Sequence, residues 1–134
     1  MPFQWTEFIE VAKKLQSQYP NGEYPEGCFR SAVSRFYYGA YGHTRCYLSR
    51  KGLFIPTRTH EDHTELRKAL LRQSRTHLIK AAGRLETLYE WRNQCDYDDN
   101  LPNQKELAEQ TELFASFVIN QIDNDEILMT AHHQ

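Results

Sequence analysis

No uninterrupted apolar run in this sequence reaches the roughly 18 residues that a helix needs to cross a bilayer. The beginning of the chain, Met1 to Glu7, also lacks the basic segment followed by an apolar one that marks a secretion signal. These absences argue against a helical membrane protein and against an exported precursor. We therefore expect a cytoplasmic protein that makes no membrane contact.

Cysteine is scarce: Cys28, Cys46 and Cys95 form no C-x-x-C pair, which argues against a disulfide framework, a zinc ribbon and a dithiol redox site. The sequence also has no glycine-rich phosphate loop and no H-E-x-x-H motif. His60 and His63 lie three residues apart, near enough on a helix to share a metal ion, but no evident third ligand accompanies them. We therefore predict neither a bound metal nor a cofactor.

The chain has little net charge, −2 at pH 7 with a pI near 6.3, which argues against nucleic-acid binding through bulk positive charge. The charges are unevenly distributed, however. Residues 45–92 carry 11 basic and 5 acidic side chains, whereas residues 93–134 carry 1 basic and 9 acidic ones. Two interpretations stay open: the basic middle forms a face that binds a polyanion, or it packs against an acidic last helix.

Apolar residues recur at steps of three and four along nearly the whole chain, and no segment alternates with period two for long enough to form a strand. Hydrophobic residues make up 40% of the 134 residues, as expected for one core. We therefore predict a single all-α domain spanning residues 1–134, an antiparallel bundle of four to five helices. The helices are expected to begin near Phe3, at Pro25, near Thr59 or His60, by Leu78 and near Asn103, and the second to end at Lys51–Gly52.

Arg92 interrupts the apolar stripe of the fourth expected helix, because it lies four residues after Leu88. Asp96 lies four residues further along the same face, with Asn93 and Tyr97 beside it. A guanidinium at the edge of a core is costly unless it is hydrogen-bonded to a carboxylate or to a phosphate of a ligand. The sequence leaves both partners open: Asp96 within the helix, or a ligand.

The second expected helix carries a polar row along one side: Arg30, Ser34, Tyr38, Tyr41 and Arg45. Tyrosines at helical spacing are common in a core, with the hydroxyl group at its rim, but they also recognise ligands. Both interpretations of this polar row stay open.

Gly39 and Gly42 lie three residues apart in the middle of the same helix, where each costs roughly 1 kcal/mol relative to alanine. The close approach of another helix would compensate for this cost, either within the chain or across a symmetric dimer. We expect a homodimer built around the second and fourth helices.

Two motifs in the chain resemble the HEPN superfamily. The first is SRFYYGAY at Ser34–Tyr41, and the second is RNQCDY at Arg92–Tyr97, about fifty residues later. They are similar to the S-R-x-Y-Y-x-A-[FY] helix and the R-N-x-x-D-Y ending of bacterial and archaeal members. The resemblance covers roughly residues 1–122.

The resemblance implies a HEPN-like helical bundle that dimerises, often beside a nucleotidyltransferase partner in toxin–antitoxin or defence systems. Many members are metal-independent RNA endonucleases, in which an arginine and a histidine a few residues apart, from both subunits, line a shared cleft. Arg92 matches the family arginine, and Asn93 matches the polar residue that commonly follows it. The histidine is missing, because Asp96 and Tyr97 stand in its place.

Two functions are compatible with these residues. One is an endoribonuclease in which Arg92 holds the scissile phosphate and Asp96 or Tyr97 replaces the histidine. Unperturbed aspartate and tyrosine titrate far from neutral pH and are poorly matched to proton transfer. We therefore favour the other, a non-catalytic module that binds RNA or a nucleotide. Its predicted ligand-binding residues are Arg92, Asn93, Ser34, Tyr38, Tyr41 and Arg45.

Overall fold

The computed structural model describes residues 2–132, and in this range it contains five helices and no strand. The predicted all-α fold is therefore confirmed, with the larger of the two expected helix numbers. The helices are α1 (Glu7–Gln16), α2 (Pro25–Arg50), α3 (Asp62–Arg72), α4 (Thr76–Tyr97) and α5 (Gln104–His132).

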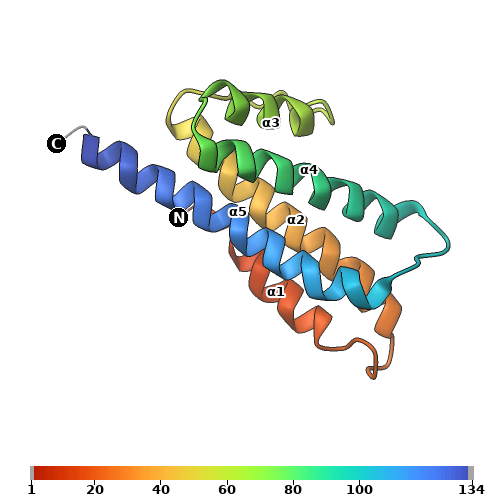
Figure 1. Cartoon of the computed structure of the whole chain (residues 1–134). Coiled ribbons are helices and arrows are strands. Elements are labelled where there is room, and N and C mark those ends of the chain that lie inside the picture. The colour runs from red at the N-terminus through yellow and green to blue at the C-terminus, as the bar shows by residue number, and fades with distance from the viewer. Residues whose placement is uncertain (1, 133–134) are drawn as a thin grey trace.

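The central helix of the bundle is α2, which packs against α1, α4 and α5. Three packed pairs run antiparallel, α1 with α2, α2 with α4, and α4 with α5, whereas α2 and α5 run in the same direction (Figure 1). The short α3 lies on the outer side of α4, and the last turns of α5 extend past the other helices (Figure 1). Within residues 2–132, no helix has an apolar stretch long enough to span a bilayer.

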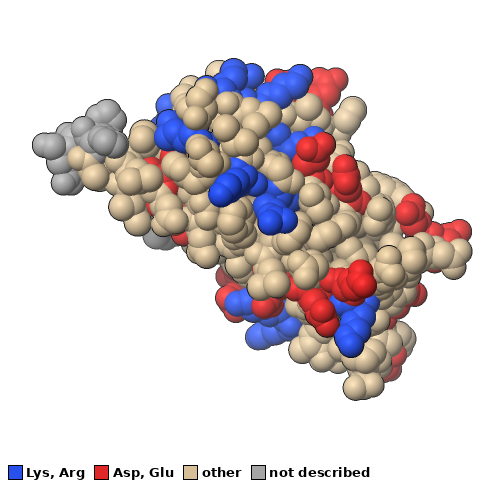
Figure 2. Space-filling model, viewed as in Figure 1, with Lys and Arg blue, Asp and Glu red and all other residues tan. Residues whose placement is uncertain are grey.

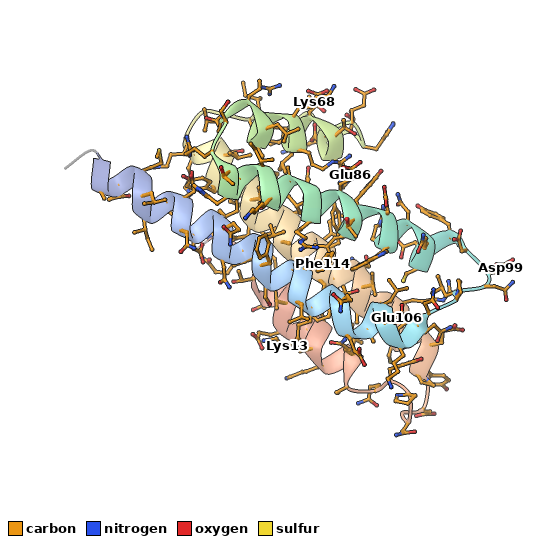
Figure 3. The ribbon with its side chains drawn as sticks, viewed as in Figure 1. Lys13, Lys68, Glu86, Asp99, Glu106 and Phe114 are labelled. Atoms are coloured by element: carbon orange, nitrogen blue, oxygen red, sulfur yellow. The ribbon has the colours of Figure 1, made fainter. Side chains whose placement is uncertain are left out.

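Apolar side chains from all five helices fill the core. Each fully buried large apolar side chain contributes about 1.5–3 kcal/mol to stability. At the seam between α4 and α5, Phe114 stacks on Trp91 with ring centroids 4.9 Å apart (Figure 3). The largest fully buried side chains are Tyr37, Tyr47, Phe29, Phe36, Leu48, Leu66, Leu70, Leu78, Leu85, Leu88, Ile122 and Val33.

The end of α2 confirms the stop that the sequence predicted. Gly52 has φ of 70°, the left-handed conformation that glycine adopts without strain. This turn lets the Leu53 N–H donate to the Leu48 carbonyl at 2.9 Å and the Gly52 N–H to the Ser49 carbonyl at 3.0 Å. The two bonds form a Schellman cap that satisfies the last carbonyls of α2.

The start of α1 differs from the prediction, because the helix begins at Glu7 rather than near Phe3. Phe3 and Trp5 continue the apolar spacing, but they pack with Phe8 as an aromatic cluster with ring centroids 5.1–5.5 Å apart. Phe3 and Trp5 are therefore apolar because they pack in the segment that precedes α1, and not because they belong to the helix.

The close helix approach at Gly39 and Gly42 occurs within the chain. A Cβ atom on Gly39 would lie 2.6 Å from Ile9 Cδ1, and one on Gly42 would lie 2.2 Å from Trp5 Cδ2. Both neighbours belong to α1 or to the segment before it. The glycines therefore accommodate α1 and give no support to a dimer interface, and the homodimer stays a prediction.

Replacing Gly42 with alanine should destabilise the fold by roughly 1–3 kcal/mol, because the added methyl group would displace the Trp5 ring. Gly83 is the control: it lies in α4, and a Cβ added there would have no other atom within 4 Å, so Gly83→Ala should stabilise the protein slightly. Urea denaturation measures both effects. A Gly42→Ala variant that kept its stability but changed its mass in light scattering would favour a dimer contact instead.

Candidate functional site

α3 begins at Asp62 rather than near Thr59 or His60, because the Asp62 carboxylate fixes the loop before it. The carboxylate accepts the backbone N–H of Thr57 at 3.0 Å and that of Arg58 at 2.9 Å, and the Thr57 hydroxyl donates to it at 2.6 Å. This hydroxyl is the main cause that lowers the pKa of Asp62. With the loop held in this way, the next residue, His63, faces α2.

His63 lies among four tyrosines, which we call the tyrosine cage: Tyr37, Tyr38 and Tyr41 from α2, and Tyr89 from α4. The Tyr37 hydroxyl is 2.5 Å from His63 Nδ1. The ring centroids of Tyr41 and Tyr89 are 4.8 and 4.9 Å from the imidazole centroid, and that of Tyr38 is at 6.1 Å. Tyr37 and Tyr41 are buried, whereas Tyr38 and Tyr89 are half-buried. The cage therefore joins three helices and keeps part of its surface open.

Burial and two arginines keep His63 neutral. Burial contributes most, the positive charges of Arg92 and Arg67 add to it, and together they lower the pKa of His63 from 6.5 to about 4. Burial also raises the pKa of Tyr41 to about 12 and raises that of Tyr37 even further. At neutral pH the cage therefore holds an uncharged imidazole and protonated phenols.

Arg92 and Arg67 flank the cage, each against one of its tyrosines. Arg92 Cζ lies 5.4 Å from the ring centroid of Tyr38, and Arg67 Cζ lies 5.3 Å from that of Tyr89. Arg92 Nε and Arg67 Nη1 are both buried, and no residue in the described range accepts a hydrogen bond from either atom. A buried N–H without an acceptor is costly. Arg92 Nε has the Asp96 carboxylate beside it, so Arg67 Nη1 is the atom that would gain most from an acceptor supplied by a ligand.

Neighbours on α4 hold Arg92 in place. Its Nη1 donates to Asn93 Oδ1 at 2.9 Å. Its Nε lies 2.9 Å from Asp96 Oδ2, but the direction of the N–H bond prevents a hydrogen bond. The ion pair between Arg92 and Asp96 that the sequence left open is therefore present. Tyr97 is 72% exposed, with its ring centroid 6.0 Å from Arg92 Cζ.

Two other predicted ligand-binding residues lie at the ends of the tyrosine row on α2. Ser34 is buried, and its Oγ lies 3.4 Å from Arg35 Nη2. Arg45 packs against Trp5, with Cζ 4.6 Å from a ring centroid of the indole, and lies 5.8 Å from the Tyr41 centroid. The structure thus gathers Arg92, Asn93, Asp96, Tyr38 and Tyr41 at the cage and leaves Ser34 and Arg45 at its margins.

Arg30 anchors the end of α4 that carries the site. Its Nη1 donates to the carbonyl oxygens of Cys95 at 3.0 Å and Asp98 at 2.6 Å, and its Nη2 donates to that of Asp99 at 3.2 Å. The last carbonyl groups of a helix have no backbone partner within that helix. The Arg30 bonds supply donors to carbonyl groups at and just after the end of α4. The last turn of α4 is therefore tied to α2, which limits how far Arg92 can move relative to Tyr38.

The basic middle of the chain is partly neutralised by α5. Arg75 Nε lies 2.6 Å from Asp125 Oδ1, and Arg50 Nη1 lies 2.9 Å from Glu126 Oε1, which confirms pairing with the last helix for these two arginines. Other basic side chains gather over α3 and the beginning of α4 (Figure 2). Lys68, for example, points from α3 into solvent (Figure 3). Binding of a polyanion by this surface stays a prediction.

Four side chains at the site escape sequence reasoning: Tyr37, His63, Arg67 and Tyr89. The spacing of His60 and His63 suggests only an incomplete metal site, and among residues 2–132 no three His, Cys, Asp or Glu side chains form a group that could hold a metal ion. The sequence does contain one signal for these residues. Arg67 follows His63 by four residues and Arg92 follows Tyr89 by three, and these spacings place each arginine on the same helix face as its aromatic neighbour.

Comparison with protein families, with curated proteins and with solved structures finds no match to this chain. The resemblance to the HEPN superfamily therefore depends on the two motifs alone, and membership stays a prediction.

Folding stability should depend on pH through His63. Below pH 6.5 the unfolded chain protonates His63, whereas the folded protein resists protonation down to about pH 4. The stabilisation is therefore fully present above pH 6.5 and lost as the pH falls towards 4, by about 2 kcal/mol after allowance for solvent screening. Urea denaturation between pH 7 and 4.5 should show a smaller pH dependence for His63→Gln, and His60→Gln, an exposed control, should behave like the wild type.

Proposed function

We propose that this protein is a non-catalytic module that holds RNA or a nucleotide through a phosphate group at Arg92, Arg67 and the tyrosine cage. One observation carries the proposal: the guanidinium groups of Arg92 and Arg67 both lie against the tyrosine cage, 5.4 Å from the Tyr38 ring centroid and 5.3 Å from the Tyr89 ring centroid, and Arg67 Nη1 has no acceptor among the described residues. A phosphate supplies several acceptor oxygens and a negative charge, which suits two guanidinium groups. Tyr38 and Tyr89 are half-buried, so part of each side chain is open to a ligand.

The resemblance to the HEPN superfamily supports the same function and two further proposals. One is that the protein forms a homodimer, which light scattering at micromolar concentration tests. The other is that it acts with a nucleotidyltransferase-type partner in a toxin–antitoxin or defence system, which the neighbouring genes would reveal.

A second candidate function is that of a metal-independent endoribonuclease. It is favoured by one observation, that a histidine lies at the site of Arg92: the ring centroids of His63 and Tyr38 are 6.1 Å apart, and Arg92 Cζ lies 5.4 Å from the same Tyr38 centroid. With a pKa of about 4, His63 is as poorly matched to proton transfer at neutral pH as an aspartate, so we place this function second. His63 would then take the proton-transfer role rather than Asp96, which is paired with Arg92, or Tyr97, which is exposed. RNA cleavage that disappears in both Arg92→Ala and His63→Gln would favour this function over binding alone.

Binding of a short single-stranded RNA should be salt-sensitive, because arginines that neutralise phosphates release the counterions around them. With one to three phosphates contacted, the affinity should fall roughly threefold to twentyfold between about 50 and 200 mM salt. Fluorescence anisotropy of a labelled oligonucleotide measures this dependence. Affinity that is unchanged across the series, or binding that is absent even at low salt, would contradict the proposed function.

A further inference from the structure

We infer that Tyr37 is a positioning residue that fixes the tautomer of His63, so that the imidazole presents an N–H donor, at Nε2, to an anionic ligand. The inference rests on the proposed function as far as the ligand is concerned. It adds the role of Tyr37 and the direction of the hydrogen bond that His63 makes.

The tautomer follows from the donors and acceptors around Tyr37. The Tyr37 side chain is 1% exposed, and its hydroxyl has one hydrogen-bond partner among the described residues, His63 Nδ1 at 2.5 Å. If Nδ1 carried the proton and donated it, the phenol hydrogen would be buried without an acceptor, at a cost of about 1–3 kcal/mol. The phenol therefore donates to Nδ1. A neutral imidazole carries one proton, so that proton is on Nε2.

His63 Nε2 is available to a ligand. It has no hydrogen-bond partner among residues 2–132. It is also not fully buried, because the fully buried side-chain N and O atoms without a partner in this range are Arg67 Nη1 and Arg92 Nε. The imidazole stays neutral at pH 7, because burial and the two arginines lower its pKa to about 4. The nearest counter-charge, Asp62, opposes this effect but is engaged by Thr57 and Arg58.

His63 Nε2–H and the guanidinium N–H groups of Arg67 and Arg92 are then hydrogen-bond donors at the same cage. Such a set is complementary to a ligand group that only accepts hydrogen bonds, such as a phosphate. With its proton on Nε2, His63 is also a hydrogen-bond donor rather than a base towards the ligand, which agrees with a binding module.

The tautomer can be read from the ¹⁵N spectrum of the free protein, since protonated and unprotonated imidazole nitrogens resonate far apart. At pH 7 we expect Nε2 to be protonated and Nδ1 to accept a hydrogen bond. Inorganic phosphate should then shift the Nε2–H resonance in a saturable manner, while chloride at the same ionic strength should not. His63 with its proton on Nδ1 in the free protein would overturn the inference.

Three variants separate positioning from structure. Tyr37→Phe keeps the ring and should weaken phosphate binding roughly threefold to tenfold, because the donor is no longer fixed. His63→Gln keeps an N–H donor and should retain more binding than His63→Leu, with melting temperatures measured for all three. Equal affinity in Tyr37→Phe and wild type would overturn the role of Tyr37. Absence of phosphate and RNA binding in the wild type would overturn the proposed function instead, while the spectrum of the free protein still decides the tautomer.

Discussion

Replacing Asp125 with asparagine should lower the free energy of unfolding by about 3–5 kcal/mol. The Asp125 carboxylate is fully buried, and it accepts hydrogen bonds from Arg75 Nε at 2.6 Å, Arg75 Nη2 at 2.9 Å, the Tyr47 hydroxyl at 2.5 Å and His77 Nε2 at 2.6 Å. Burial alone would raise the pKa of Asp125, but the hydrogen bonds from Arg75, Tyr47 and His77 outweigh it and the pKa is lowered. Asparagine cannot balance the charge of Arg75, and its amide hydrogens would face other donors.

Asp123→Asn is the matched control, because it makes the same chemical change two residues away. Asp123 contacts His43 at 2.7 Å, but its side chain is 50% exposed, so the loss should stay below about 1 kcal/mol. Urea denaturation followed by circular dichroism measures both variants. Similar losses in the two would mean that the buried network around Asp125 contributes no more than a surface pair.

Arg92→Ala should weaken binding of single-stranded RNA by roughly 1.5–3 kcal/mol, which is about a tenfold to more than hundredfold loss of affinity. The melting temperature should change little. Asp96, the partner left behind, has 30% of its side chain exposed and can be solvated by water. A large loss of stability with unchanged intrinsic affinity would assign Arg92 to the fold rather than to a ligand.

Arg84→Ala is the control for this experiment, because it also removes an arginine of α4 that packs on an aromatic ring. Arg84 Cζ lies 4.1 Å from the ring centroid of Phe114, away from the tyrosine cage. Its loss should leave RNA affinity nearly unchanged. Equal losses for Arg84→Ala and Arg92→Ala would favour a diffuse basic surface over a defined site.

The helices could be predicted from sequence because their signals are local. The three- and four-residue spacing of apolar side chains and the Lys51–Gly52 stop are properties of neighbouring residues, and α2 ends as they predict. The starts of α1 and α3 depend instead on particular side-chain contacts that the apolar spacing does not specify. Phe3 packs as part of an aromatic cluster, and Asp62 holds the loop before α3.

The site could be predicted only in part, because some of its contacts form only when the helices pack together. The position of Arg92 on an apolar face indicated a partner, and Asp96 and Tyr38 are indeed beside it. His63 could not be placed, because its surroundings arise only when α3 folds back over α2 and α4. Asp125 lies three residues after the buried Ile122, but Asp123 and Glu126 beside it make this part of α5 look like an ordinary acidic surface.

The most direct test of the proposed phosphate site is the response of individual arginine side chains to RNA. In a ¹⁵N-labelled protein titrated with a short single-stranded RNA, we expect the Nε–H resonance of Arg92 to shift and saturate. The Nε–H of Arg75, which already donates to Asp125 at 2.6 Å, should stay in place and serves as an internal control. An Arg92 resonance that does not move while RNA binds, or one that moves no more than that of Arg75, would contradict the account.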